Sequence, residues 1–107
     1  MEAALERLIP GLQSIYGDLL VSVILYGSAA RGTDTDESDV DIALILNGGA
    51  TPEMYDQLLE LVVDLEIEYG KVFSLIRIDA ERFREWETVM PYYRSIRQEG
   101  VVLWQAA

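Results

Sequence analysis

The fold is decided by Gly27-Ser28-Ala29-Ala30-Arg31-Gly32 and, a few residues later, by Ser38-Asp39-Val40-Asp41-Ile42. An apolar run over residues 19–26 leads into the first motif, and a second run over residues 40–46 begins inside the other. Both runs are short and contain β-branched residues, which is typical of buried strands. The sequence therefore predicts two strands joined through a glycine-serine turn and a polar loop.

Two carboxylates stand at the start of the second predicted strand. Because side chains alternate between the two faces of a strand, Asp39 and Asp41 should point the same way, about 7 Å apart. Like charges on one strand face repel each other unless a cation joins them. Magnesium prefers a few carboxylate oxygens together with the phosphate oxygens of a substrate. The pair therefore predicts a divalent-cation site that binds phosphates, although an ordinary helix-capping turn followed by a solvated acidic loop is the alternative.

These motifs, GSxARG followed by SDxD, resemble the signature of the DNA polymerase β-like nucleotidyltransferase superfamily. In so short a chain they look most like its minimal nucleotidyltransferases (MNT). The order of elements and the segment over residues 93–103 also look like that family, so the resemblance extends over most of the chain. It implies the polymerase β-like palm, a small mixed sheet with helices packed on it.

The resemblance also implies roles for individual residues. Gly27 and Ser28 would hold the β- and γ-phosphates of a nucleoside triphosphate, most simply ATP. Asp39 and Asp41 would be the catalytic carboxylates that hold Mg²⁺. Arg31 would either contact a phosphate or anchor the loop through carboxylates.

Members of this family often accompany a small helical HEPN protein in a toxin–antitoxin pair, and some transfer AMP to a tyrosine of that partner. The resemblance thus implies transfer of AMP to a hydroxyl group of a HEPN toxin. Two alternatives stay open: a degenerate antitoxin that neutralises a HEPN ribonuclease by complex formation, and a subunit that completes a larger transferase.

One part of the family pattern is missing from this chain. Active polymerase β-like enzymes generally add a third carboxylate from a later strand, but no acid occurs between Glu68 and Asp79. Asp79 is a candidate substitute, and the loop acids Asp34, Asp36 and Glu37 are others. The motifs therefore indicate ancestry and nucleotide binding more strongly than turnover.

Composition limits the remaining possibilities. The 107 residues fit a single domain, 1–107, and they include no cysteine and no histidine. Disulfides, histidine-based acid–base chemistry and zinc sites with Cys or His ligands are therefore excluded. We also expect neither a signal peptide nor a membrane span, and a cytoplasmic location is the expectation that fits.

The net charge of −11 is concentrated in the first part of the chain. Residues 1–70 hold 14 acids against Arg7 and Arg31, whereas residues 71–107 hold 5 acids against 6 basic residues. Because binding to nucleic acid depends on cationic neutralisation of phosphates, we expect no direct binding of DNA or RNA. A basic protein partner is compatible with the charge, and so is simple solubility.

The remaining pattern predicts a mixed α/β (α+β) domain. A helix over residues 2–16 should kink or break at Pro10-Gly11, and further helices are expected after Thr51-Pro52, over residues 80–89 and over residues 92–98. The second and third strands, the latter over residues 72–78, should be parallel if they are neighbours. Residues 101–104 should form an edge strand or a docking segment. The core stripe of the helix that follows Thr51 and ends at Gly70 is predicted to consist of Tyr55, Leu58, Leu59, Val62 and Leu65.

Overall fold

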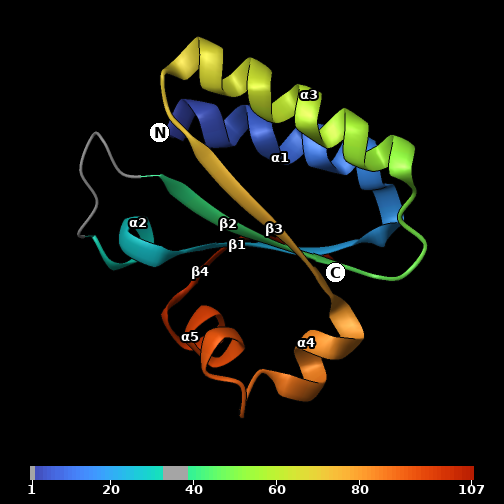
Figure 1. Cartoon of the computed structure of the whole chain (residues 1–107), viewed down its shortest axis with the longest axis vertical. Helices are drawn as coiled ribbons and strands as arrows, with labels where there is room; N and C mark the ends of the chain where they lie inside the picture. Colours follow the sequence, from blue (N-terminus) through green and yellow to red (C-terminus); the bar gives the residue numbers. More distant parts are fainter. Residues whose placement is uncertain (1, 33–38) are drawn as a thin grey trace.

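A four-stranded sheet lies between two layers of helices in the computed structural model, which describes residues 2–32 and 39–107 (Figure 1). The elements are α1 (Glu2–Tyr16), the 3-10 turn η1 (Gly17–Leu19), β1 (Leu20–Tyr26), α2 (Gly27–Arg31), β2 (Val40–Leu46), α3 (Pro52–Tyr69), β3 (Phe73–Asp79), α4 (Ala80–Trp86), α5 (Pro91–Glu99) and β4 (Val101–Gln105). This confirms the predicted fold class.

The strand order is β3-β2-β1-β4, so β3 and β4 form the two edges of the sheet. β2 and β3 are parallel and are joined through α3, as predicted for neighbouring strands. β1 is antiparallel to both β2 and β4, which confirms the C-terminal segment as an edge strand. The sheet is therefore mixed.

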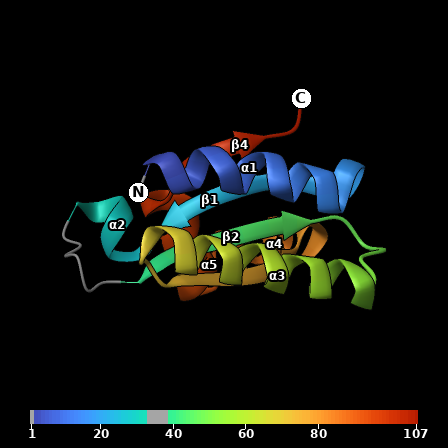
Figure 2. The same ribbon diagram turned by 90° about the horizontal axis from the view of Figure 1, so that it is seen from above.

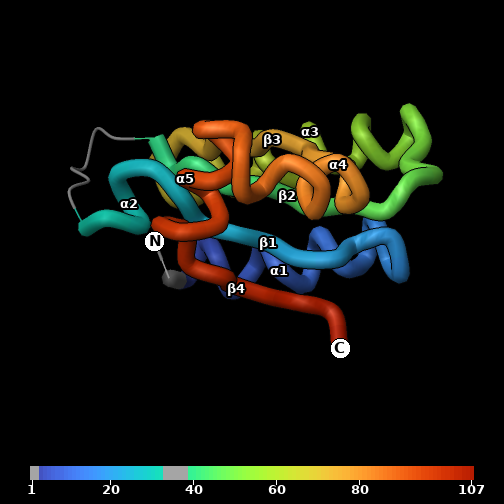
Figure 3. The backbone as a smooth tube through the Cα atoms, turned by 90° about the horizontal axis from the view of Figure 1, so that it is seen from below, coloured from blue at the N-terminus to red at the C-terminus, as the bar shows by residue number. Residues whose placement is uncertain are grey.

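Each face of the sheet is covered by its own pair of helices. α1 and α3 lie side by side on one face, with α3 toward the β3 edge (Figure 2). α4 and α5 lie on the other face (Figure 3). Alternate residues of the central strands supply the two cores: Ile42 and Leu44 face α1 and α3, whereas Ala43 and Ile45 face α4 and α5.

The prediction for α1 needs a correction. Pro10 does not divide it, because one helix runs from Glu2 to Tyr16. Proline removes one backbone hydrogen bond from a helix, but burial of an apolar face can outweigh that loss. Leu8 and Leu12 are fully buried on either side of the proline, and Gly11 lies directly against Leu61 of α3. Tertiary packing therefore holds the helix together.

α3 begins and ends where the sequence predicts, but its buried stripe is narrower. The Thr51 hydroxyl accepts a hydrogen bond from the Met54 amide, and Gly70 ends the helix in a left-handed conformation. Leu58 and Leu65 are buried, whereas Tyr55 and Leu59, which we predicted to belong to the core, are 38% and 45% exposed. The reason is that α1 covers only one flank of α3.

The C-terminal helices also differ slightly from the prediction. α4 ends at Trp86, three residues earlier than predicted, and α5 begins with Pro91 as its first residue. No helix among the described residues combines the length and the apolar character needed to cross a bilayer.

Candidate functional site

The glycine-serine turn is shaped by one close approach of side chain to backbone. β1 ends at Tyr26, and Gly27 then opens α2 with a φ of +72°. A Cβ atom at this position would overlap with Oδ2 of Asp41. Glycine is therefore required twice, for the left-handed backbone and for the space that the Asp41 carboxylate occupies.

Asp41 lies near the start of the central strand β2, next to this turn. On β2 it pairs with Tyr26 of β1 on one side and with Ser74 of β3 on the other. Its neighbours on the same strand face, such as Ala43, pack toward α4 and α5, so the carboxylate belongs to that face. The sheet thus presents Asp41 beside the start of α2, as the sequence predicts.

The electrostatics of Asp41 show that its charge is poorly compensated. Partial burial raises the pKa of its carboxyl group, and the negative charge of Asp39 raises it further, while Arg31 acts in the opposite direction. Asp39 is itself exposed and immediately precedes β2. The two carboxylates therefore act on each other, and a bound cation would relieve their repulsion.

Arg31 of α2 forms an ion pair with α5. It is the last residue of α2, and its Nη1 atom lies 3.9 Å from Oε2 of Glu99. Both side chains are about half exposed, so this pair contributes little to stability. The contact joins Arg31 to α5 and not to the loop, so both roles predicted for Arg31, anchoring of the loop and contact with a phosphate, stay predictions. Ser28 is half-buried in the first turn of α2, where backbone amides have no helical acceptor.

Asp79 cannot replace the missing third carboxylate on this strand. The residue directly beside Asp41 on β3 is Ser74, whereas Asp79 pairs with Leu46 at the opposite end of the sheet. Asp79 follows Ser74 by five positions along the strand, a distance of about 16 Å. The Asp79 carboxylate instead accepts a hydrogen bond from the Arg82 amide and caps α4.

No third acidic side chain joins Asp39 and Asp41 within the described part of the chain. Residues 2–32 and 39–107 contain no group of three or more acidic side chains placed to hold a metal. The loop acids Asp34, Asp36 and Glu37, which we named as alternatives, lie outside the described residues. Asp39 and Asp41 offer the oxygen donors that Mg²⁺ prefers, and a nucleotide would have to supply further ligands.

One contact at the site could not be predicted from the sequence. The Tyr26 hydroxyl lies 2.9 Å from the Tyr92 hydroxyl, and the two rings meet edge to face at 6.1 Å. Burial raises the pKa of Tyr26, and the hydrogen bond with Tyr92 and the charge of Asp41 act in the same direction. The position of Tyr26 before Gly27 marks it as a neighbour of the site, but no pattern in the sequence pairs it with α5.

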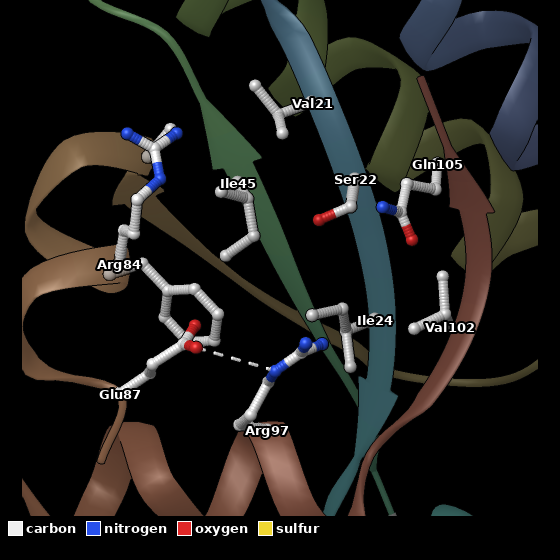
Figure 4. A pocket seen from close by; sticks show the side chains of 11 residues that line it. Val21, Ser22, Ile24, Ile45, Arg84, Glu87, Arg97, Val102 and Gln105 are labelled. Atoms are coloured by element: carbon white, nitrogen blue, oxygen red, sulfur yellow. Dashed lines mark ion pairs between the residues drawn. The ribbon is translucent and has the colours of Figure 1, made fainter. Parts of the chain in front are cut away.

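A hollow lies on the same face of the sheet as Asp41, between β1, β4, α4 and α5 (Figure 4). It has a volume of about 240 Å³, and Ser22, Arg84 and Arg97 are among its lining residues. The Nε atom of Arg97 lies 3.6 Å from Oε1 of Glu87, so this cation already has an anionic partner. Neither Asp39 nor Asp41 lines this hollow, which separates it from the predicted metal site.

Comparison with known proteins places the chain in a family. The family model "Polymerase beta, Nucleotidyltransferase" matches residues 16–105. A protein of Methanocaldococcus jannaschii named "Putative protein adenylyltransferase MJ0604" is 31% identical over 103 residues, which are 96% of this chain and 97% of the relative. A second protein of that organism, "Putative protein adenylyltransferase MJ1305", is 31% identical over 77 residues, which are 70% of this chain and 52% of the relative.

Solved structures confirm the fold. A crystal structure described as "the toxin-antitoxin with AMP-PNP" superposes with a TM-score of 0.62 at 24% identity, covering 94% of this chain and 73% of that chain. The likeness at this identity concerns the fold, whereas the match over residues 16–105 concerns the sequence itself. This chain is a member of the polymerase β nucleotidyltransferase family.

Proposed function

We propose that this chain binds Mg²⁺–ATP at the turn formed by Gly27 and Ser28 and transfers AMP to a hydroxyl group of a partner protein. The observation that carries the proposal is the position of the Asp41 carboxylate. It lies against the Gly27 backbone, and its negative charge and that of Asp39 repel each other. The adenylyltransferase names of the two M. jannaschii relatives support ATP as the nucleotide.

The chemistry assigns a simple task to each part of the site. The acceptor oxygen would attack the α-phosphorus, the bond from that phosphorus to the pyrophosphate oxygen would break, and the hydroxyl proton would pass to solvent or to a base. Gly27 allows the triphosphate to approach the backbone, and Ser28 and the amides of α2 can donate to phosphate oxygens. Bound Mg²⁺ would be held by Asp39 and Asp41, and it offsets the charge that develops on the leaving pyrophosphate.

For the acceptor we propose a small helical toxin of the HEPN type. The fold neighbour described as a toxin–antitoxin complex is compatible with this partner. A second function has its own observation: Ser74 occupies the position beside Asp41 where a third carboxylate would stand. The described residues offer neither a base nor a second set of metal ligands at this position, which favours slow transfer, so we propose as the second function an antitoxin that neutralises its partner by complex formation.

Calorimetry with ATP in the presence of Mg²⁺ tests the site directly. We expect Asp39→Asn combined with Asp41→Asn to weaken nucleotide affinity at least tenfold, because both cation ligands lose their charge. Glu85→Gln on α4 is the control, since it removes an exposed acid elsewhere. Equal affinity in the double variant and the wild type would refute the site.

The two functions are separated by incubating the chain with radiolabelled ATP, Mg²⁺ and a purified HEPN protein. Label that becomes covalently attached to the partner indicates transfer. Inhibition of the partner's ribonuclease without attached label, retained in the double Asn variant, indicates neutralisation by complex formation alone.

A further inference from the structure

The outer flank of α3 carries an apolar stripe that none of the other described elements covers. Tyr55, Leu59, Val63 and Ile67 follow one another at intervals of four residues, so they lie along one side of the helix. Their exposed fractions are 38%, 45%, 49% and 79%. Single exposed apolar residues are common on proteins, but a continuous row over three turns indicates a surface that another molecule covers.

The geometry of the helix layer explains why this flank is open. α1 packs on the opposite flank of α3, where Gly11 meets Leu61 and Arg7 pairs with Glu68. The open flank lies toward β3, the edge strand, since the Arg77 guanidinium of β3 lies 4.1 Å from the centre of the Tyr55 ring. Figure 2 shows α3 running along this edge of the sheet.

A row of acids accompanies the stripe. Asp56, Glu60 and Asp64 each follow a stripe residue by one position, and all three are exposed. A shallow hollow of about 350 Å³ is lined by both kinds of residue: Leu59 and Val63 together with Glu60 and Asp64. Arg77 is the cation that contacts the stripe, and it does so only at the Tyr55 end.

We propose that this surface, the α3 stripe, binds an amphipathic helix of a partner protein whose apolar face is bordered by lysine or arginine. Apolar residues at intervals of four on one helix complement those on another, which is a common mode of helix recognition. The acidic row selects for basic residues at the border of that helix. A second copy of this chain fits less well, because two molecules of charge −11 would bring their acidic rows together.

This surface is independent of the nucleotide site. α3 lies on the α1 face of the sheet, whereas Asp41 belongs to the face covered by α4 and α5. A partner bound along α3 would leave the start of α2 accessible. The inference therefore goes beyond the proposed function and does not depend on nucleotide transfer.

Two synthetic helical peptides of equal length and identical leucine face, one bordered by lysine and one by glutamate, test the proposal. Fluorescence anisotropy with the full chain should show binding of the lysine peptide that weakens with salt, and at least tenfold weaker binding of the glutamate peptide. Leu59→Gln combined with Val63→Gln should reduce the lysine-peptide affinity at least tenfold. Val101→Thr is the matched control, since Val101 on the other edge of the sheet is 46% exposed.

Several outcomes would overturn the proposal. These are no binding of the lysine peptide, equal binding of both peptides, or undiminished binding by the double Gln variant. Sedimentation velocity provides a further check, because a dimer that the double Gln variant abolishes would assign the surface to a second copy. The double variant Asp39→Asn, Asp41→Asn should bind the peptide like the wild type. Loss of nucleotide binding can therefore be distinguished from loss of peptide binding at the α3 stripe.

Discussion

At the scale of single residues, Gly27 is where backbone geometry and chemistry coincide. Its left-handed conformation, with a φ of +72°, turns the chain from β1 into α2, and its missing side chain leaves room for Asp41. Gly32 at the end of α2 has nearly the same φ, +74°, but no atom of the described residues beyond its chain neighbours lies within 4 Å of the place where its Cβ would be. The two glycines therefore share a left-handed backbone conformation and differ in the described contacts around them.

We expect Gly27→Ala to destabilise the chain more than Gly32→Ala. Both variants acquire the penalty of a left-handed alanine, about 1 kcal/mol. Only the first also places Cβ in the space of the Asp41 carboxylate, which would have to turn away to make room, so its total loss of stability should be the larger of the two. Urea unfolding of both variants measures the difference, and calorimetry should show lost nucleotide binding for Gly27→Ala alone. Equal unfolding free energies would contradict the close approach.

At the scale of elements, β3 determines how complete the site is. The register of β3 against β2 places Ser74 beside Asp41. We therefore expect Ser74→Asp to lower stability without metal, because a third carboxylate would join two that already repel each other. The same variant should bind Mn²⁺ at least tenfold more tightly than the wild type, as measured by calorimetry. In assays with a partner protein, Ser74→Asp should also accelerate AMP transfer.

Asp79→Asn serves as the comparison for this strand. Asp79 lies at the far end of β3 and caps α4, and an asparagine oxygen can accept the same hydrogen bond from the Arg82 amide, so the substitution should leave both stability and Mn²⁺ affinity nearly unchanged. A fall in metal affinity in Asp79→Asn would contradict the register described here.

The sequence predicts elements well where a local signal exists. Thr51 and Gly70 mark the ends of α3, and Asp41 lies beside the Gly27 turn as its position at the start of the second predicted strand indicates. Prediction from the sequence fails where the outcome depends on distant contacts. Pro10 stays inside a helix because α1 is packed against α3, and Tyr55 and Leu59 are exposed because none of the described elements covers their flank. The Tyr26–Tyr92 contact joins residues far apart in the chain, so no local pattern could reveal it.

At the scale of the whole molecule, charge decides which partners are accessible. The net charge is −11, and the first 70 residues carry 14 of the 19 acids. We expect no binding of RNA or DNA by the isolated chain in a gel-shift assay at physiological salt, because nothing compensates the repulsion from phosphates. A control with a basic protein of similar size should shift the same probes. Micromolar or tighter binding by this chain would contradict the expectation.

The edge position of β4 has a consequence for the order in which the molecule opens. β4 is hydrogen-bonded to β1 alone within the described chain, their pairing joins distant parts of the sequence, and its ladder is irregular between Val23 and Ile24. An edge strand that is paired on one side only has fewer backbone hydrogen bonds and more solvent exposure than a central strand, so it opens at a lower free energy. Hydrogen exchange measured by mass spectrometry should therefore find β4 amides exchanging before those of β1 and β2. Because Gly100, which precedes β4, lies against Ile24 and the Leu25 carbonyl, each such opening would loosen the strand that leads into the Gly27 turn without unfolding the rest of the sheet.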